Sequence, residues 1–137
     1  MAATGDNEAL EQRLDTLDEA IETLEERLRA GEDLALEPTL EEGVDIARRL
    51  LTAYAEHAGK EMPETDDLLK LFKAFVKGDP SLNAVRDNLR ELVYYQNCIA
   101  MERRDALPEA PERMVVRTIR HLYLYLRTRC EQEGRLP

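Results

Sequence analysis

Leucine and isoleucine recur through the first quarter of the chain at alternating steps of four and three residues. The stripe consists of Leu10, Leu14, Leu17, Ile21, Leu24 and Leu28. This spacing places all six side chains on one face of a helix, with Glu and Asp covering the other faces. Gly31 follows where such a helix is expected to end. The pattern predicts a helix over residues 8–30, preceded by a disordered lead over residues 1–7 with Asp6 or Asn7 as its N-cap.

Four more helices follow from the apolar spacing and from Pro and Gly as start and stop signals. They are expected to run from Pro38 to Gly59, from residues 62–66 to Lys77, from Asp79 and Pro80 to Arg104, and from Pro111 to Gly134. The connections between them are short, which favours antiparallel neighbours. The sequence therefore predicts an all-α fold: a five-helix up-down bundle with a long heptad-patterned N-terminal helix and no β-sheet. It forms a single helical domain over residues 8–137.

Composition narrows the class of protein. The chain has 137 residues, of which 43% are hydrophobic and 35% charged, values typical of a folded domain with a highly charged surface. Its N-terminus lacks a secretory pattern and no apolar run approaches membrane-spanning length, so we expect a cytoplasmic protein without a membrane partner. Cys98 and Cys130 are expected to be reduced, and two Cys with two scattered His predict no metal site. The glycines are isolated, so no phosphate loop and no cofactor are expected.

Charge is unevenly distributed along the chain. The net charge is −10. Residues 1–45 carry fifteen acidic residues against three Arg, a balance of −12, and residues 46–137 carry fourteen acidic against sixteen basic residues, a balance of +2. An acidic chain is a poor general binder of nucleic acid, because such binding depends on neutralising phosphates with Lys and Arg.

Positive charge is concentrated in the last predicted helix. Residues 113–130 contain five Arg and His121 without a single carboxylate. We predict that this helix binds a partner through Arg113, Arg117, Arg120 and Arg127. The alternative is that these arginines pair with the acidic helices of the same chain.

A polar cluster is also predicted between the last two helices. If these helices form an antiparallel hairpin that turns near Leu107 and Pro108, positions whose numbers sum to about 215 lie level with each other. The cluster is then formed by Tyr94, Tyr95, Gln96 and Asn97 beside Arg117, Arg120, His121 and Tyr123. The same register places Cys130 far from Cys98, so no disulfide is expected between them.

The segment R117-T-I-R-H121-L-Y123 resembles the Arg–spacer–His–x–Tyr signature of HEPN domains. The resemblance implies a small all-helical dimer, which in many members of that family is a metal-independent ribonuclease and in others a non-catalytic partner of a nucleotidyltransferase. For this chain it implies Arg117 and His121 as catalytic residues, assisted by Tyr123.

Two functions remain open from the sequence. We favour a non-enzymatic, acidic helical adaptor that forms a homodimer through the helix at residues 8–30, since a three-heptad apolar seam pairs readily with its own copy. The partner would be a protein, with nucleic acid less favoured. The alternative is a HEPN-like ribonuclease or toxin-type protein that uses Arg117 and His121.

Overall fold

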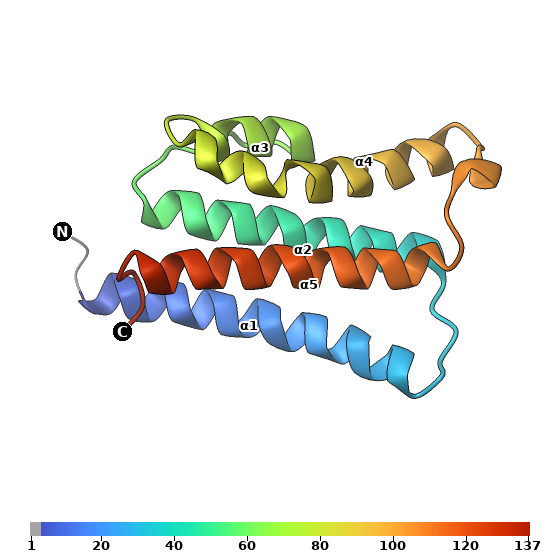
Figure 1. The fold of residues 1–137 in the computed structure, drawn as a ribbon, viewed down its shortest axis with the longest axis horizontal. Coiled ribbons are helices and arrows are strands. Elements are labelled where there is room, and N and C mark those ends of the chain that lie inside the picture. The colour runs from blue at the N-terminus through green and yellow to red at the C-terminus, as the bar shows by residue number, and fades with distance from the viewer. Residues whose placement is uncertain (1–3) are drawn as a thin grey trace.

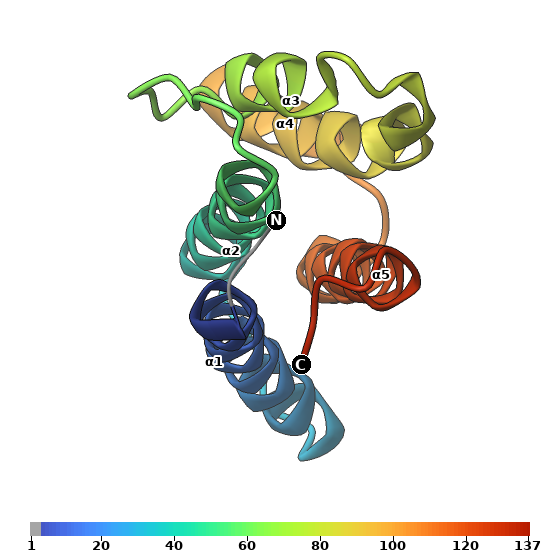
Figure 2. The ribbon, with the colours of Figure 1, turned by 90° about the vertical axis from the view of Figure 1, so that its left-hand side faces the viewer.

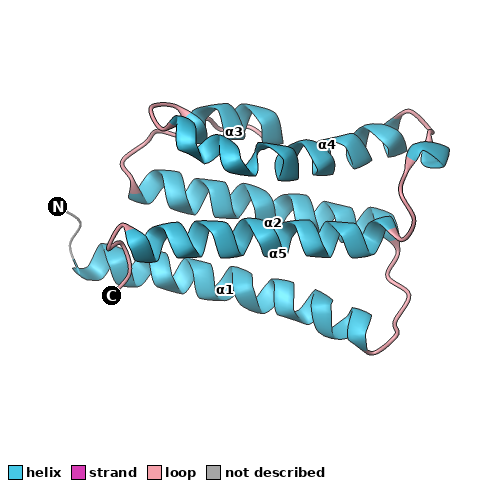
Figure 3. Cartoon of the chain, in the orientation of Figure 1, coloured by secondary structure: helices cyan, strands magenta, loops and turns pink. Residues whose placement is uncertain are grey.

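The structure is a computed structural model that describes residues 4–137, and over this range it consists of helices and loops without a strand (Figure 3). The five α-helices are α1 (Thr4–Arg29), α2 (Leu36–His57), α3 (Leu68–Val76), α4 (Arg86–Ala100) and α5 (Pro111–Gln132). Two short 3₁₀-helices, η1 (Pro80–Val85) and η2 (Arg104–Ala106), lie on either side of α4. The predicted all-α up-down bundle is confirmed.

The three long helices α1, α2 and α5 run side by side, and α3 and α4 cover the opposite side of α2 and α5 (Figures 1 and 2). The described chain therefore begins and ends at the same end of the bundle (Figure 1). Helix α2 lies at the centre, because it contacts α1, α3, α4 and α5. Its apolar face is correspondingly wide, and residues such as Ala47, Leu50 and Leu51 are fully buried.

The heptad stripe of α1 packs inside the chain. Leu14 and Ile21 are completely buried, and Leu10, Leu17 and Leu24 are nearly so. They pack against α2 and α5, which both contact α1. The seam on which the homodimer prediction rested is therefore already occupied, and the homodimer stays a prediction that needs another face of α1.

Gly43 allows α2 and α5 to approach each other closely. A Cβ atom at this position would lie 2.6 Å from Cγ1 of Val115, well inside van der Waals contact. Gly43 thus lies inside α2 as a packing position, whereas the sequence analysis considered glycine only as a stop signal for helices. Gly31 does end α1 as predicted, with a positive φ of 77° that favours glycine.

Two element boundaries differ most from the prediction, and α3 also begins later, at Leu68, than the predicted start at residues 62–66. The disordered lead was predicted over residues 1–7, but α1 begins at Thr4, with Asp6 in its first turn where a carboxylate favours the helix dipole; residues 1–3 lie outside the described residues. The predicted helix from Asp79 to Arg104 is divided into η1 and the shorter α4. Asp79 caps η1 by accepting a hydrogen bond from the backbone N–H of Ser81, as the Asp-Pro signal implied.

Candidate interaction surface on α5

The inner arginines of α5 are neutralised by carboxylates of α1. Arg120 donates to Asp18 Oδ1 at 2.7 Å and to both carboxylate oxygens of Glu25, at 2.7 and 3.1 Å. Its side chain is only 19% exposed, and its guanidinium also lies over the ring of Tyr123. The hydrogen bonds to Glu25 and then Asp18 outweigh the opposing effect of burial and raise the pKa of Arg120. These contacts make Arg120 a link between α5 and α1.

Arg127 is also neutralised by α1, whereas Arg129 is neutralised by carboxylates outside that helix. Arg127 donates to Asp15 at 2.8 Å and to the hydroxyl of Tyr123 at 3.1 Å. Arg129 joins α5 to η1, since it donates to Asp79 at 2.8 Å. Two members of the predicted partner-binding set, Arg120 and Arg127, are therefore partly buried in intramolecular ion pairs, and the acidic N-terminal helix is their partner.

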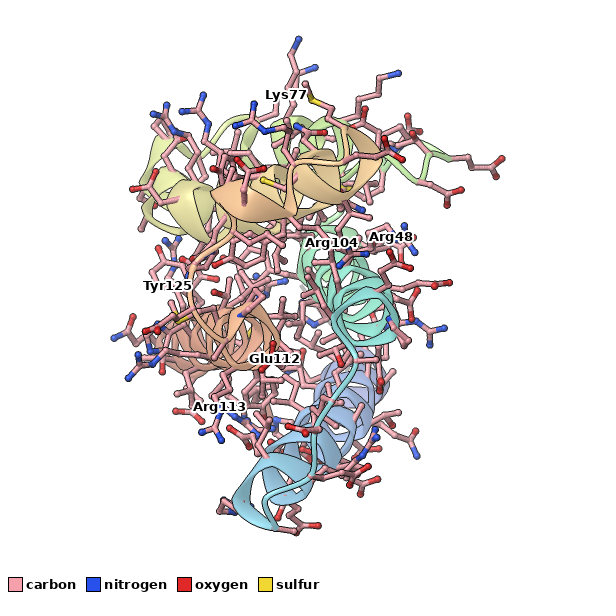
Figure 4. All side chains as sticks on the ribbon, turned by 90° about the vertical axis from the view of Figure 1, so that its right-hand side faces the viewer. Arg48, Lys77, Arg104, Glu112, Arg113 and Tyr125 are labelled. Carbon is pink, nitrogen blue, oxygen red and sulfur yellow. The ribbon has the colours of Figure 1, made fainter. Side chains whose placement is uncertain are left out.

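A different face of α5 remains exposed, and we call it the outer stripe. It consists of Arg113, Arg117, His121, Leu124 and Thr128. These residues are three or four positions apart, so they lie on one side of the helix. Arg113 and Arg117 make no ion pair or side-chain hydrogen bond with residues 4–137, and Figure 4 shows Arg113 extending outward from α5. Leu124 is 51% exposed. The stripe thus combines two unneutralised cations with an exposed apolar side chain.

The three residues of the HEPN resemblance do not converge. Arg117 and His121 are one helical turn apart on the outer stripe. Tyr123 is buried, and burial raises the pKa of its hydroxyl. That hydroxyl accepts a hydrogen bond from Arg127 on the side of α5 that faces α1. Tyr123 is therefore not placed to assist His121.

The predicted polar cluster between α4 and α5 does not form as expected. The hydroxyl of Thr118 donates to Glu91 at 3.2 Å, so the two helices pair about six positions away from the predicted register. The predicted register of α4 against α5 was wrong because the two helices are not joined by a tight turn. Helix α4 ends at Ala100, and residues 101–110 form a longer connection that contains η2. Tyr94 and Tyr95 consequently do not lie level with Arg120 and His121.

The four α4 residues of that cluster have separate environments. Tyr94 is 49% exposed and its hydroxyl donates to the carbonyl of Ala106 at 2.8 Å. Tyr95 is buried and its hydroxyl donates to Glu91. Gln96 and Asn97 are exposed. They do not form a convergent site.

A second set of polar residues, which the sequence interpretation missed, meets at the end of the bundle where the described chain begins and ends. The guanidinium of Arg135 lies 4.0 Å from the ring centroid of Tyr54 and its Nε donates to Nδ1 of His57 at 2.9 Å. The Nε2 atom of His57 is 2.9 Å from the side-chain oxygen of Asn7, so His57 is held neutral with its proton on Nε2. The sequence offered one signal, a histidine in the last turn of α2, and tertiary packing supplied its partners.

The charges in this C-terminal cluster are mutually satisfied. Burial lowers the pKa of His57, and the positive charge of Arg135 lowers it further. Burial and a hydrogen bond to Glu133 raise the pKa of Tyr54 to about 12. Burial alone would raise the pKa of Glu133, but hydrogen bonds from Arg129, Tyr54 and Arg135 outweigh it and the pKa is lowered. The cluster attaches the C-terminal residues to α2, and its role is therefore structural.

Comparison with known proteins gives no relative: no family model, no curated protein and no solved structure matches this chain. Within residues 4–137 no three His, Cys, Asp or Glu side chains gather as metal ligands. None of the described helices has the length and apolarity needed to cross a membrane.

Proposed function

We propose that this protein is a non-enzymatic interaction module, an acidic helical adaptor that binds an acidic protein partner through the outer stripe of α5. The observation that carries the proposal is the division of the arginines on this helix. Arg120 and Arg127 are neutralised by α1, whereas Arg113 and Arg117 keep their charge on an exposed face.

The geometry of the stripe fits carboxylates on a helix or an extended strand of the partner. Arg113 and Arg117 are four residues apart, so their Cβ atoms are roughly 6 Å apart, and each guanidinium can bind a carboxylate in two-point fashion. Leu124 supplies apolar contact on the same face. Two exposed arginines are too few for strong binding of nucleic acid, because that affinity grows with the number of phosphates neutralised. The net charge of −10 also opposes binding of nucleic acid.

The experiment measures binding of a fluorescent, Glu-rich helical peptide with carboxylates one turn apart, by fluorescence anisotropy. We expect the double variant Arg113→Glu/Arg117→Glu to bind at least roughly tenfold more weakly, a loss of about 1.4 kcal/mol. The matched control is Arg86→Glu, which reverses an exposed arginine in the first turn of α4 and should bind normally. Equal binding by both variants would remove the outer stripe from the proposal.

The alternative function, a HEPN-like metal-independent ribonuclease, rests on one feature: Arg117 and His121 share the outer stripe one turn apart. Incubation of single-stranded RNA with the protein in a metal chelator tests it. If the protein cleaves RNA and the His121→Ala variant does not, the ribonuclease function is supported and the adaptor function is rejected. Intact RNA would eliminate the ribonuclease.

The proposed adaptor is a homodimer through α1 and works in the cytoplasm. Cys98 and Cys130 support the cytoplasmic location, because both are buried free thiols in a chain without a disulfide among its described residues. For the homodimer, the buried seam of α1 already lies in the core, so the contact must use an exposed face of this helix.

A further inference from the structure

One side of α1 carries no carboxylates, although the helix contains nine Asp and Glu residues. This side lies next to α2 and includes Ala9, Gln12, Arg13 and Thr16, all of them exposed. Their spacing of three, one and three residues keeps them on one side of the helix, between the buried heptad stripe and the outermost carboxylates. It is the part of α1 that another negatively charged molecule can approach without meeting like charge.

The same residues line a groove between α1 and α2. A cavity of about 390 Å³ is lined by Ala9, Gln12, Arg13, Thr16, Leu17 and Arg49, without a carboxylate. Two further cavities share lining residues with it: one of about 260 Å³ also contains Ala9 and Arg13, and one of about 330 Å³ also contains Arg13 and Arg49. The two neighbouring cavities also contain Asp6, Glu56 and Glu64, so only the cavity of about 390 Å³ is free of carboxylates, and we call it the α1–α2 groove.

The groove is bordered by cations that remain accessible. The side chains of Arg13 and Arg49 are 46% and 66% exposed, and each has one carboxylate within ion-pair distance. Arg48 lies beside them on the side of α2 that faces away from α5 (Figure 4). Such exposed pairs are weak, so these arginines can exchange or share their carboxylates with those of another molecule.

We propose that the α1–α2 groove is the dimer interface and that its occupant is a second copy of this chain. The copy offers the required chemistry: Glu8, Glu19, Glu22 and Glu26 are exposed on the outer side of α1 and make no ion pair with residues 4–137. In a two-fold pair each copy places these carboxylates at the arginines of the other, so every contact occurs twice. The uncharged side chains of Ala9 and Thr16 allow the two helices close approach.

This inference rests on the homodimeric adaptor proposed above and specifies its interface. The groove and the outer stripe of α5 lie on different faces of the bundle, since Arg49 and Arg113 border separate surfaces. Dimerisation and binding of the acidic peptide are therefore expected to fail independently: Arg113→Glu/Arg117→Glu should remain dimeric, and a groove variant should still bind the peptide.

Sedimentation equilibrium of the full chain over a range of concentrations tests the interface. We expect the wild type to reach twice the chain mass of 15.7 kDa. Thr16→Glu, which introduces a carboxylate into the groove, should weaken dimerisation at least tenfold and keep the helical circular dichroism of the wild type. The matched control Thr128→Glu makes the same change at an exposed position of α5 and should dimerise normally.

A cross-linking experiment locates the contact directly. Both native thiols are buried, so a bis-maleimide should link only Thr16→Cys chains into dimers, and Thr128→Cys chains should stay single. A wild type that is monomeric at every concentration would overturn the proposal. So would a dimer that Thr16→Glu leaves unchanged, because that dimer would use another surface.

Discussion

Replacing Arg120 with alanine tests the idea that the acidic N-terminal helix is the partner of the arginine-rich helix. The change removes a largely buried guanidinium that makes three hydrogen bonds, to Asp18 and Glu25. It also leaves those two carboxylates, 38% and 28% exposed, beside an empty space. Unlike the exposed ion pairs of this chain, the contact should therefore contribute measurably to stability.

The magnitude follows from the geometry. Hydrogen bonds to charged groups contribute about 1.5–3 kcal/mol when their partners are buried, and partial exposure of the two carboxylates reduces this. We expect Arg120→Ala to lower the free energy of unfolding by about 2 kcal/mol. The unfolding entropy of a 137-residue chain is about 0.29 kcal/mol/K, so the melting temperature should fall by about 7 °C.

The assay is thermal and urea unfolding followed by circular dichroism, with Arg117→Ala as the matched control. Arg117 is exposed and makes no intramolecular ion pair, so its replacement should change stability by less than about 0.5 kcal/mol. If the two variants lose the same stability, the ion pairs between α1 and α5 are solvated and contribute nothing. The reasoning that separates the inner arginines from the outer stripe would then be wrong.

Two further predictions concern packing and pH. Gly43→Ala should destabilise the protein by about 1–2 kcal/mol in urea unfolding, because overpacking at the 2.6 Å contact exceeds the gain in helix propensity; Gly5→Ala, with open space around it, should be neutral or slightly stabilising. The pKa of His57 is lower in the folded chain than in the unfolded one, so the unfolded state binds more protons and stability should decline as pH falls below about 6.5. The melting temperature should therefore drop more between pH 8 and pH 5.5 in the wild type than in His57→Gln, and an equal drop would show that the contact with Arg135 does not depend on the neutral imidazole.

The sequence determined the helices of this protein because helix formation depends on local signals. The alternating steps of Leu and Ile defined the buried face of α1, Gly31 ended that helix, and Pro111 opened α5. These signals act within a few residues of each other, so they can be recognised without knowing the fold. The composition likewise showed that residues 1–45 are strongly acidic and that positive charge gathers in the last helix.

Only the tertiary structure decided which charges and which faces are available. The sequence marked Arg113, Arg117, Arg120 and Arg127 as equals, yet Arg120 and Arg127 face α1 and are neutralised by it. The difference arises from helix packing angles and loop geometry, which bring residues about a hundred positions apart into contact. The same reason explains the shifted register of α4 and α5 and the meeting of His57 with Arg135. Local sequence fixes which face of a helix is polar, and packing alone fixes what that face meets.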